Sequence, residues 1–198
     1  SAFRSYLIFT GDAVPFVNGS TFYYPPLVIP TYGLAQYFFG PSVYVGRALS
    51  ALFFVGLTIL VYLVGKKMGG RWAGIGAVAL IFTNLLLVSN YVTATMYAMT
   101  MFLLMVMVWF ELYELSWSKK AVLSGFMTGI IFLARANMVS VIPIYLVYLF
   151  IMKAPLRSFM LYGLTAIFVI VFGYLPLIIP NPPIALGHLL SPFVNYGF

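Results

Sequence analysis

Long apolar runs separated by short polar breaks make up most of the chain between residues 43 and 179. A helix needs about 20 apolar residues to cross the roughly 30 Å of hydrocarbon in a bilayer. Four of the runs suit a single crossing, and they lie at 43–65, 72–89, 91–109 and 156–179. The remaining run, 121–151, carries Arg135-Ala136-Asn137 near its middle and suits two shorter helices. The pattern predicts an all-α integral membrane protein with about six transmembrane helices.

Basic residues occupy every second break between these runs. Seven of the ten Lys and Arg residues fall into three clusters, namely Lys66, Lys67 and Arg71, then Lys119 and Lys120, then Lys153 and Arg157. Basic residues in short loops stay on the cytoplasmic side during insertion, so these clusters orient the chain. Because the apolar runs alternate with the clusters in step, we expect both ends of the chain to lie outside the cytoplasm.

The composition agrees with a bilayer as the main solvent. The chain is 64% hydrophobic and 7% charged, with a mean hydropathy of +1.08, whereas soluble proteins are about 25% charged. The basic clusters that orient the chain account for the net charge of +7. The chain lacks a basic stripe with interleaved aromatics, so a nucleic-acid partner is not predicted. Cysteine is absent, which excludes disulfides and thiolate metal sites.

The two ends of the chain differ from the spans between them. Residues 1–42 are rich in proline and are predicted to form an exoplasmic loop. Within this loop, Thr31–Phe39 is apolar but too short to span, so we expect an interfacial helix with Tyr and Phe at headgroup level. Residues 180–198 are predicted to be an exoplasmic tail. We interpret the chain as one multi-pass membrane domain in the cell membrane, with six spans over 43–179.

Arg135 stands at the apex of the short pair of helices. The 14 residues from Ala121 to Ala134 reach only about 21 Å at 1.5 Å per residue, which is roughly 9 Å short of a bilayer core. The apex is therefore expected below the outer surface, where a cation lines a cavity or faces an anion. Two alternatives are a locally thinned bilayer with Arg135 reaching the headgroups, and a helix-end arginine that bonds neighbouring carbonyls.

Candidate chemistry is concentrated on the predicted exterior side. No Gly-rich phosphate loop, metalloprotease motif or nucleophile elbow is present, and no cofactor or metal site is predicted. The exterior side carries the polar candidates Asp12, Arg47, Arg135 and His188. Arg47 lies one turn inside the first span and either snorkels or faces a cavity, and a lone loop histidine such as His188 is more often a surface group than a catalyst. The residues indicate an exterior polar cavity with few charges, without naming a reaction.

Several motifs in order resemble one known family. Thr10 to Gly19 (TGDAVPFVNG) and Phe22 to Leu27 (FYYPPL) resemble the first external loop of GT-C membrane glycosyltransferases, the relatives of protein mannosyltransferases and aminoarabinose transferases. Further along, the chain has FGPS at 39–42, GRALSALF at 46–53, LVGKKMGGR at 63–71 and GIIFLAR at 129–135, each similar to a family segment. The resemblance covers residues 5–153.

The resemblance implies a GT-C-like fold with its active cavity on the exoplasmic side. It further implies a polyprenyl-phosphate-linked sugar donor and an inverting transfer to a hydroxyl or amine, with membrane lipid as a partner. On the family pattern, Asp12, Tyr24, Pro25 and Pro26 belong to the substrate-binding loop, and Arg47, Arg135 and His188 join them as candidate binding residues.

The chain departs from the family pattern at three places. The family's catalytic acid lies upstream of the TGD motif and would precede Ser1, so Asp12 is interpreted as a loop-ordering residue. The second external loop, Asn90 to Tyr97, carries no acid, and Tyr24 stands where some relatives have a basic residue. We therefore interpret the chain as the middle of such an enzyme without its native N- and C-terminal parts, with a degenerate paralogue as the alternative.

Two other classes of function compete with a glycosyltransferase. One is a small membrane carrier or flippase for a lipid or apolar solute, which typically shows internal repeats and interrupted helices. The other is a non-catalytic membrane assembly protein. The chain shows no internal repeat and places about 42 residues before its first span, and both features favour the enzyme.

Overall fold

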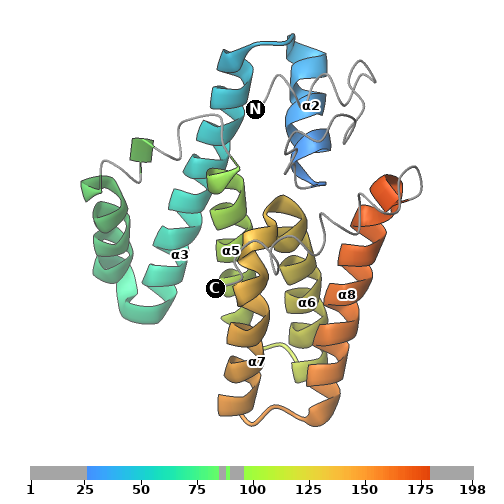
Figure 1. Ribbon diagram of the computed structural model, residues 1–198. Coiled ribbons are helices and arrows are strands. Elements are labelled where there is room, and N and C mark those ends of the chain that lie inside the picture. Colours follow the sequence, from blue (N-terminus) through green and yellow to red (C-terminus); the bar gives the residue numbers. More distant parts are fainter. Residues whose placement is uncertain (1–25, 85–87, 90–95, 179–198) are drawn as a thin grey trace, which may run out of the picture.

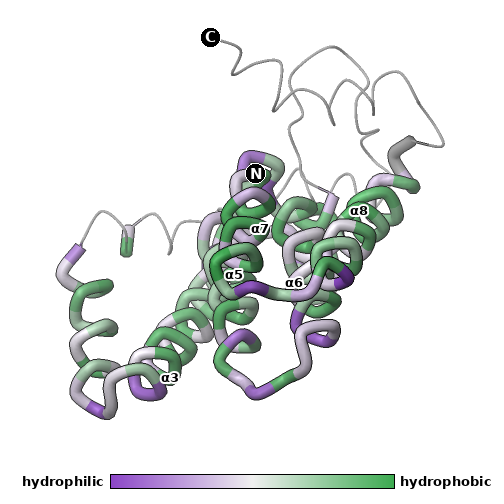
Figure 2. The backbone as a smooth tube through the Cα atoms, turned by 90° about the horizontal axis from the view of Figure 1, so that it is seen from below, coloured by the Kyte–Doolittle hydropathy of each residue, from purple (hydrophilic) through white to green (hydrophobic). Residues whose placement is uncertain are grey.

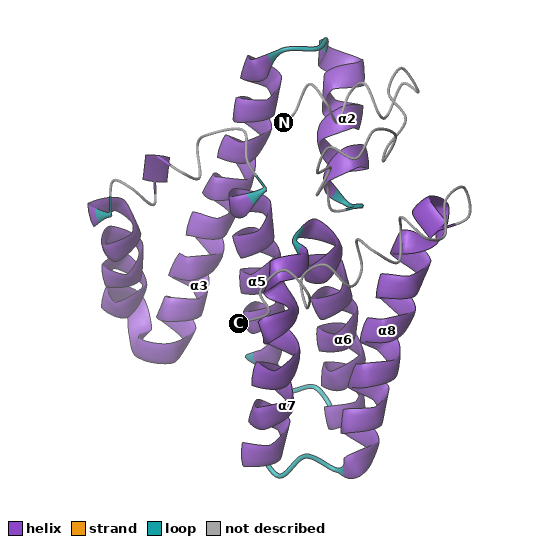
Figure 3. Cartoon of the chain, viewed as in Figure 1, coloured by secondary structure: helices purple, strands orange, loops and turns teal. Residues whose placement is uncertain are grey.

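The computed structural model describes residues 26–84, 88–89 and 96–178, and these residues form helices and connecting turns without a strand (Figure 3). The all-α prediction is thus confirmed for this part of the chain. The elements are α2 (Val28–Phe39), α3 (Val43–Thr83), α5 (Tyr97–Glu111), α6 (Trp117–Ala134), the 3-10 helix η1 (Ala136–Ser140), α7 (Val141–Ile151) and α8 (Leu156–Ile178).

The predicted short helix before the first span is present as α2. It begins at Val28, three residues before the predicted Thr31, because Pro30 is tolerated in the first helical turn, where its missing N–H costs no bond. The helix ends at Gly40, whose φ of 87° lies in the left-handed region that glycine adopts without strain. Ser42 then caps α3 by accepting a hydrogen bond from the Tyr44 backbone N–H at 3.2 Å.

Helix α3 contains the first two predicted spans, joined by a tight turn. Gly69 and Gly70 leave helical geometry, and Gly70 has a φ of 81° that favours glycine. Beside the turn the two arms of α3 approach closely, since a Cβ on Gly74 would lie 2.7 Å from the Tyr62 carbonyl oxygen. The second arm ends at Thr83, with Asn84 as its cap, so the single span predicted over 72–89 was too long.

The remaining helices run alternately up and down. In Figure 1 the turn of α3, the α5–α6 connection and the α7–α8 connection all lie toward the lower end of the bundle. Figure 2 looks from that end and colours parts of these connections as hydrophilic. The three basic clusters of the sequence fall in or beside these three connections, so the clusters share one end of the molecule, as the alternation pattern predicts.

Helix α6 is longer than the sequence predicted. It begins at Trp117, four residues before Ala121, because its first turn includes the lysine pair with long aliphatic stems. Its 18 residues span about 27 Å, which removes most of the predicted 9 Å shortfall. Because α6 is longer, Arg135 lies farther from the basic end of the bundle than the sequence indicated. The preceding predicted span also differs at its start, since α5 begins at Tyr97 rather than near Tyr91.

Close packing of α6 against α8 forms the centre of the bundle. A Cβ on Gly125 would lie 2.5 Å from the Tyr162 carbonyl oxygen, and one on Gly129 would lie 2.6 Å from Val169 Cβ. Gly125 and Gly129 form a small-xxx-small pattern, which lets two helix backbones approach in the manner of transmembrane helices. The Tyr162 hydroxyl adds a buried hydrogen bond by donating to Thr128 Oγ1 at 3.1 Å.

The outer surface of the bundle is apolar. Large side chains are exposed along one face of α8, among them Leu164, Phe168 and Phe172. By length and composition, α3 and residues Leu156–Pro176 of α8 could cross a membrane, whereas Tyr97–Glu111 and Ala136–Ile151 are apolar but shorter. The described residues thus hold two candidate membrane-spanning helices, and the total of six spans stays a prediction.

The glycine packing yields a stability prediction. Gly125→Ala should destabilise the bundle by about 1–3 kcal/mol, because its Cβ meets backbone that cannot rotate away. Gly163→Ala on α8 is the control, since its Cβ meets nothing within 4 Å and alanine favours the helix. Thermal unfolding of both variants in the same detergent tests the prediction, and equal melting temperatures would contradict it.

Candidate functional site

Arg135 lies where α6 ends, at the end of the bundle opposite the basic connections. Its backbone is extended (φ −161°, ψ 106°), and its N–H donates to the Ile131 carbonyl at 2.9 Å, which closes the helix. The guanidinium carbon lies 4.1 Å from the centre of the Tyr97 ring, and Nη2 donates a long hydrogen bond of 3.4 Å to the Tyr97 hydroxyl. Stacking on an aromatic face is how arginine is held without losing its donors.

The predicted substrate-binding loop reaches α6 beside this arginine. Directly after Pro26, the Leu27 N–H donates to the Leu133 carbonyl at 3.1 Å, two residues before Arg135. Leu27 also packs against the buried pair Phe132 and Leu133. Leu27, the last residue of the FYYPPL motif, thus contacts α6 two residues before Arg135.

Helix α2 packs against α3 at the same end of the bundle as Arg135, and a buried polar contact joins the two helices. The Tyr32 hydroxyl and Ser50 Oγ lie 2.8 Å apart in a hydrogen bond. Burial raises the pKa of Tyr32 above its ordinary value, and the bond to Ser50 offsets part of that rise. One turn further along α2, the Gln36 side chain is only 1% exposed, and its amide atoms have no hydrogen-bond partner.

Among the described residues, no hydrogen bond or ion pair joins Arg47 or Pro26 to Arg135. Arg47 is exposed on the first turns of α3. Pro26 is half-buried in the turn before α2. The calls on Asp12, Tyr24, Pro25 and His188 fall outside the described residues.

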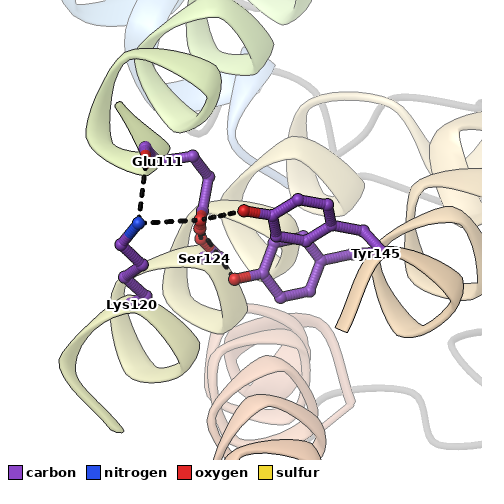
Figure 4. A network of polar contacts seen from close by, with 5 residues as sticks. Glu111, Lys120, Ser124 and Tyr145 are labelled. Carbon is purple, nitrogen blue, oxygen red and sulfur yellow. Dashed lines mark hydrogen bonds and ion pairs between the residues drawn. The ribbon is translucent and has the colours of Figure 1, made fainter. Parts of the chain in front are cut away.

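A second polar group, which sequence analysis did not single out, surrounds Glu111 at the basic end of the bundle (Figure 4). Its Oε1 accepts from Ser124 Oγ at 2.6 Å and from the Tyr145 hydroxyl at 2.7 Å, and its Oε2 accepts from the Tyr148 hydroxyl at 3.3 Å. Lys120 Nζ donates to the Glu111 carbonyl at 2.8 Å and lies 3.9 Å from Oε2. The carboxylate thus joins α5, α6 and α7.

The chemistry of the Glu111 group is that of a structural link. Every oxygen of the carboxylate already accepts a hydrogen bond, and Lys120 both balances its charge and caps the last carbonyl of α5. The sequence gives only the spacing of Ser124, Tyr145 and Tyr148. That spacing predicts a shared acceptor only once α6 and α7 are known to lie side by side. The Arg135 guanidinium makes one long hydrogen bond and therefore has fewer polar partners than the Glu111 carboxylate.

No metal centre emerges from the part of the chain that the structure describes, since no group of three His, Cys, Asp or Glu side chains gathers there. Comparisons with protein-family models, with curated proteins and with solved structures found no match for this chain. The resemblance to GT-C glycosyltransferases therefore stays a prediction that rests on the motifs themselves.

The Glu111 link yields a second stability prediction. Glu111→Ala should destabilise the protein by about 1–3 kcal/mol, because it leaves the hydroxyls of Ser124 on α6 and of Tyr145 on α7 without their acceptor. Glu114→Ala removes an exposed carboxylate three residues away and should change stability by no more than about 0.5 kcal/mol. Denaturant unfolding in detergent compares the two, and similar losses in both variants would show that the network contributes nothing specific.

Proposed function

We propose that the protein is a multi-pass membrane glycosyltransferase of GT-C type. It would take a sugar from a polyprenyl-phosphate donor and transfer it to an acceptor on the exoplasmic side. The observation that carries the proposal is the state of Arg135. Its guanidinium is half-buried and stacked on Tyr97, and it makes no ion pair with any described carboxylate.

A lipid-linked phosphate has the chemistry that such an arginine requires. The planar guanidinium presents two parallel N–H donors to two phosphate oxygens, and a stacked guanidinium keeps its outer edge available. A cation at the edge of the hydrocarbon is costly unless an anion compensates it. The Pro26–Leu27 turn, which belongs to the family-like loop motif, contacts the same end of α6 and is thus close to where the donor headgroup would bind.

The orientation is tested with introduced cysteines. The chain contains no cysteine, so single cysteines at 68, 118 and 155, and at 20, 136 and 188, report without background. We expect a membrane-impermeant thiol reagent added outside intact cells to label the second group only, because short basic loops stay cytoplasmic. Labelling of position 68 or 118 from outside would contradict the proposed topology.

The role of Arg135 is tested by substitution in the protein expressed from its native gene. Arg135→Lys keeps the charge but loses the two-donor edge, so donor affinity should fall about tenfold while the protein still inserts and folds. Arg135→Gln should abolish transfer. Arg157→Gln, which removes an exposed cation at the opposite end, is the matched control and should leave transfer unchanged.

Binding of a radiolabelled polyprenyl-phosphate sugar and the rate of transfer are measured on the same membranes. Wild-type donor affinity and turnover in Arg135→Gln would overturn the assignment of Arg135 to the donor. Loss of both in Arg135→Gln and in Arg157→Gln would show a general effect of charge on folding instead.

A further inference from the structure

The turn of α3 combines basic and amphipathic exposed groups in a short stretch. Gly69 and Gly70 reverse the chain, which brings Lys66 and Lys67 on one arm close to Arg71 on the other. All three cations are exposed. Acidic residues are absent from both arms of α3, so no carboxylate of α3 offsets these three charges.

Two large side chains of the same turn project from the molecule. Met68 is 74% exposed, and Trp72 is 81% exposed, the highest value among the large hydrophobic side chains of the described residues. A tryptophan with an apolar body and one N–H donor suits the boundary between headgroups and hydrocarbon. The arm from Val43 to Lys66 has 24 residues and spans about 36 Å, so the turn lies at the interface opposite α2 if this arm crosses a bilayer.

One cation of the turn is already held in place by aromatic rings of α5 and its C-terminal connection. Lys67 Nζ lies 4.1 Å from the centre of the Tyr113 ring and 5.7 Å from that of Trp109. Such contacts order the side chain without neutralising its charge. Glu114, the exposed carboxylate that follows Tyr113 in the sequence, makes no ion pair with any described cation.

We propose that the α3 turn, residues 66–72, binds the headgroup of an anionic phospholipid in the cytoplasmic leaflet. The phosphate and the negative headgroup would contact Lys66, Lys67 and Arg71, while Trp72 enters the interface beside the acyl chains. This inference rests on the proposed function, in which the chain crosses the membrane several times. It gives the basic cluster of the α3 turn a second role, selective contact with a lipid, beside the orientation of the chain. Each basic residue near an anionic membrane surface strengthens the attraction of its segment to that surface roughly fivefold.

The experiment uses Trp72 as the reporter. Tryptophan occurs three times, so the Trp109→Phe, Trp117→Phe background leaves Trp72 as the only indole and keeps an aromatic ring beside Lys67. The protein is reconstituted in phosphatidylcholine vesicles that contain equal mole fractions of brominated phosphatidylglycerol or brominated phosphatidylcholine. Bromine quenches tryptophan on contact, so the ratio of the two quenching efficiencies measures headgroup preference at the turn.

We expect brominated phosphatidylglycerol to quench Trp72 about twofold or more strongly than brominated phosphatidylcholine. The preference should weaken at high salt, which screens exposed charges. Lys66→Gln with Arg71→Gln should abolish it. Lys119→Gln with Lys153→Gln removes the same charge from the other two connections and should leave it intact.

The possible failures are distinguishable. Equal quenching by the two brominated lipids would overturn the anionic-lipid site while leaving the turn at a membrane interface. Absence of quenching by either lipid would place Trp72 in water and overturn the multi-pass placement as well. An equal loss of preference in both double variants would overturn a local site in favour of a general charge effect of the whole end.

Discussion

The close approach of α6 and α8 is the contact on which the rest of the structure depends. In hydrocarbon, helices gain little from hiding apolar side chains, so they associate where small residues let their backbones touch. Gly125 and Gly129 provide that contact along α6, and Gly173 provides the complementary one on α8, where a Cβ would lie within 2.3 Å of Leu133. The Thr128–Tyr162 hydrogen bond lies between the glycine contacts and fixes their register. The positions of Arg135 and Glu111 follow, because one terminates α6 and the other bonds to its side.

Helix α7 is held in a different way from α8. Its buried face consists of Val141, Tyr145 and Leu149, and the centre of the Tyr145 ring lies 4.5 Å from that of Tyr162 on α8, with the two rings tilted by 32°. Bulky rings keep the α7 backbone away from its neighbours, whereas glycines bring α6 and α8 together. The hydroxyls of Tyr145 and Tyr148 then donate to Glu111 and hold α7 against α5 at the basic end of the bundle. Since α7 continues from η1, this link also limits the movement of the turn that follows Arg135.

Much of the architecture could be predicted from the sequence, because it depends on the lengths of the apolar runs and on the positions of the basic clusters between them. The helical class, the helix before the first span and the sharing of one end by three basic clusters all follow from local patterns. The exact start of α6 did not, because lysines with apolar stems extend this helix beyond its apolar run. The Glu111 network was also missed, since its donors are up to 37 positions away and meet only through tertiary packing. Arg135 could be found because a cation inside an apolar run is conspicuous, whereas Tyr97, its partner 38 residues earlier, carries no such signal.

The two ends of α6 present opposite electrostatic situations, and the contrast supports the proposed role of Arg135. Near the basic end, Glu111 has three hydroxyl donors and a lysine, so its charge is fully compensated within the protein. At the other end, Arg135 has one aromatic ring and one hydrogen bond of 3.4 Å, and its remaining donors bond to no described side chain. A fold that supplies four groups to a structural carboxylate has the means to satisfy a structural arginine equally well. The charge left incompletely paired is the one that a ligand can complete, and its planar donor edge suits a phosphate. For this reason the proposed donor site lies at the Arg135 end of α6, whereas the Glu111 end links the helices to one another.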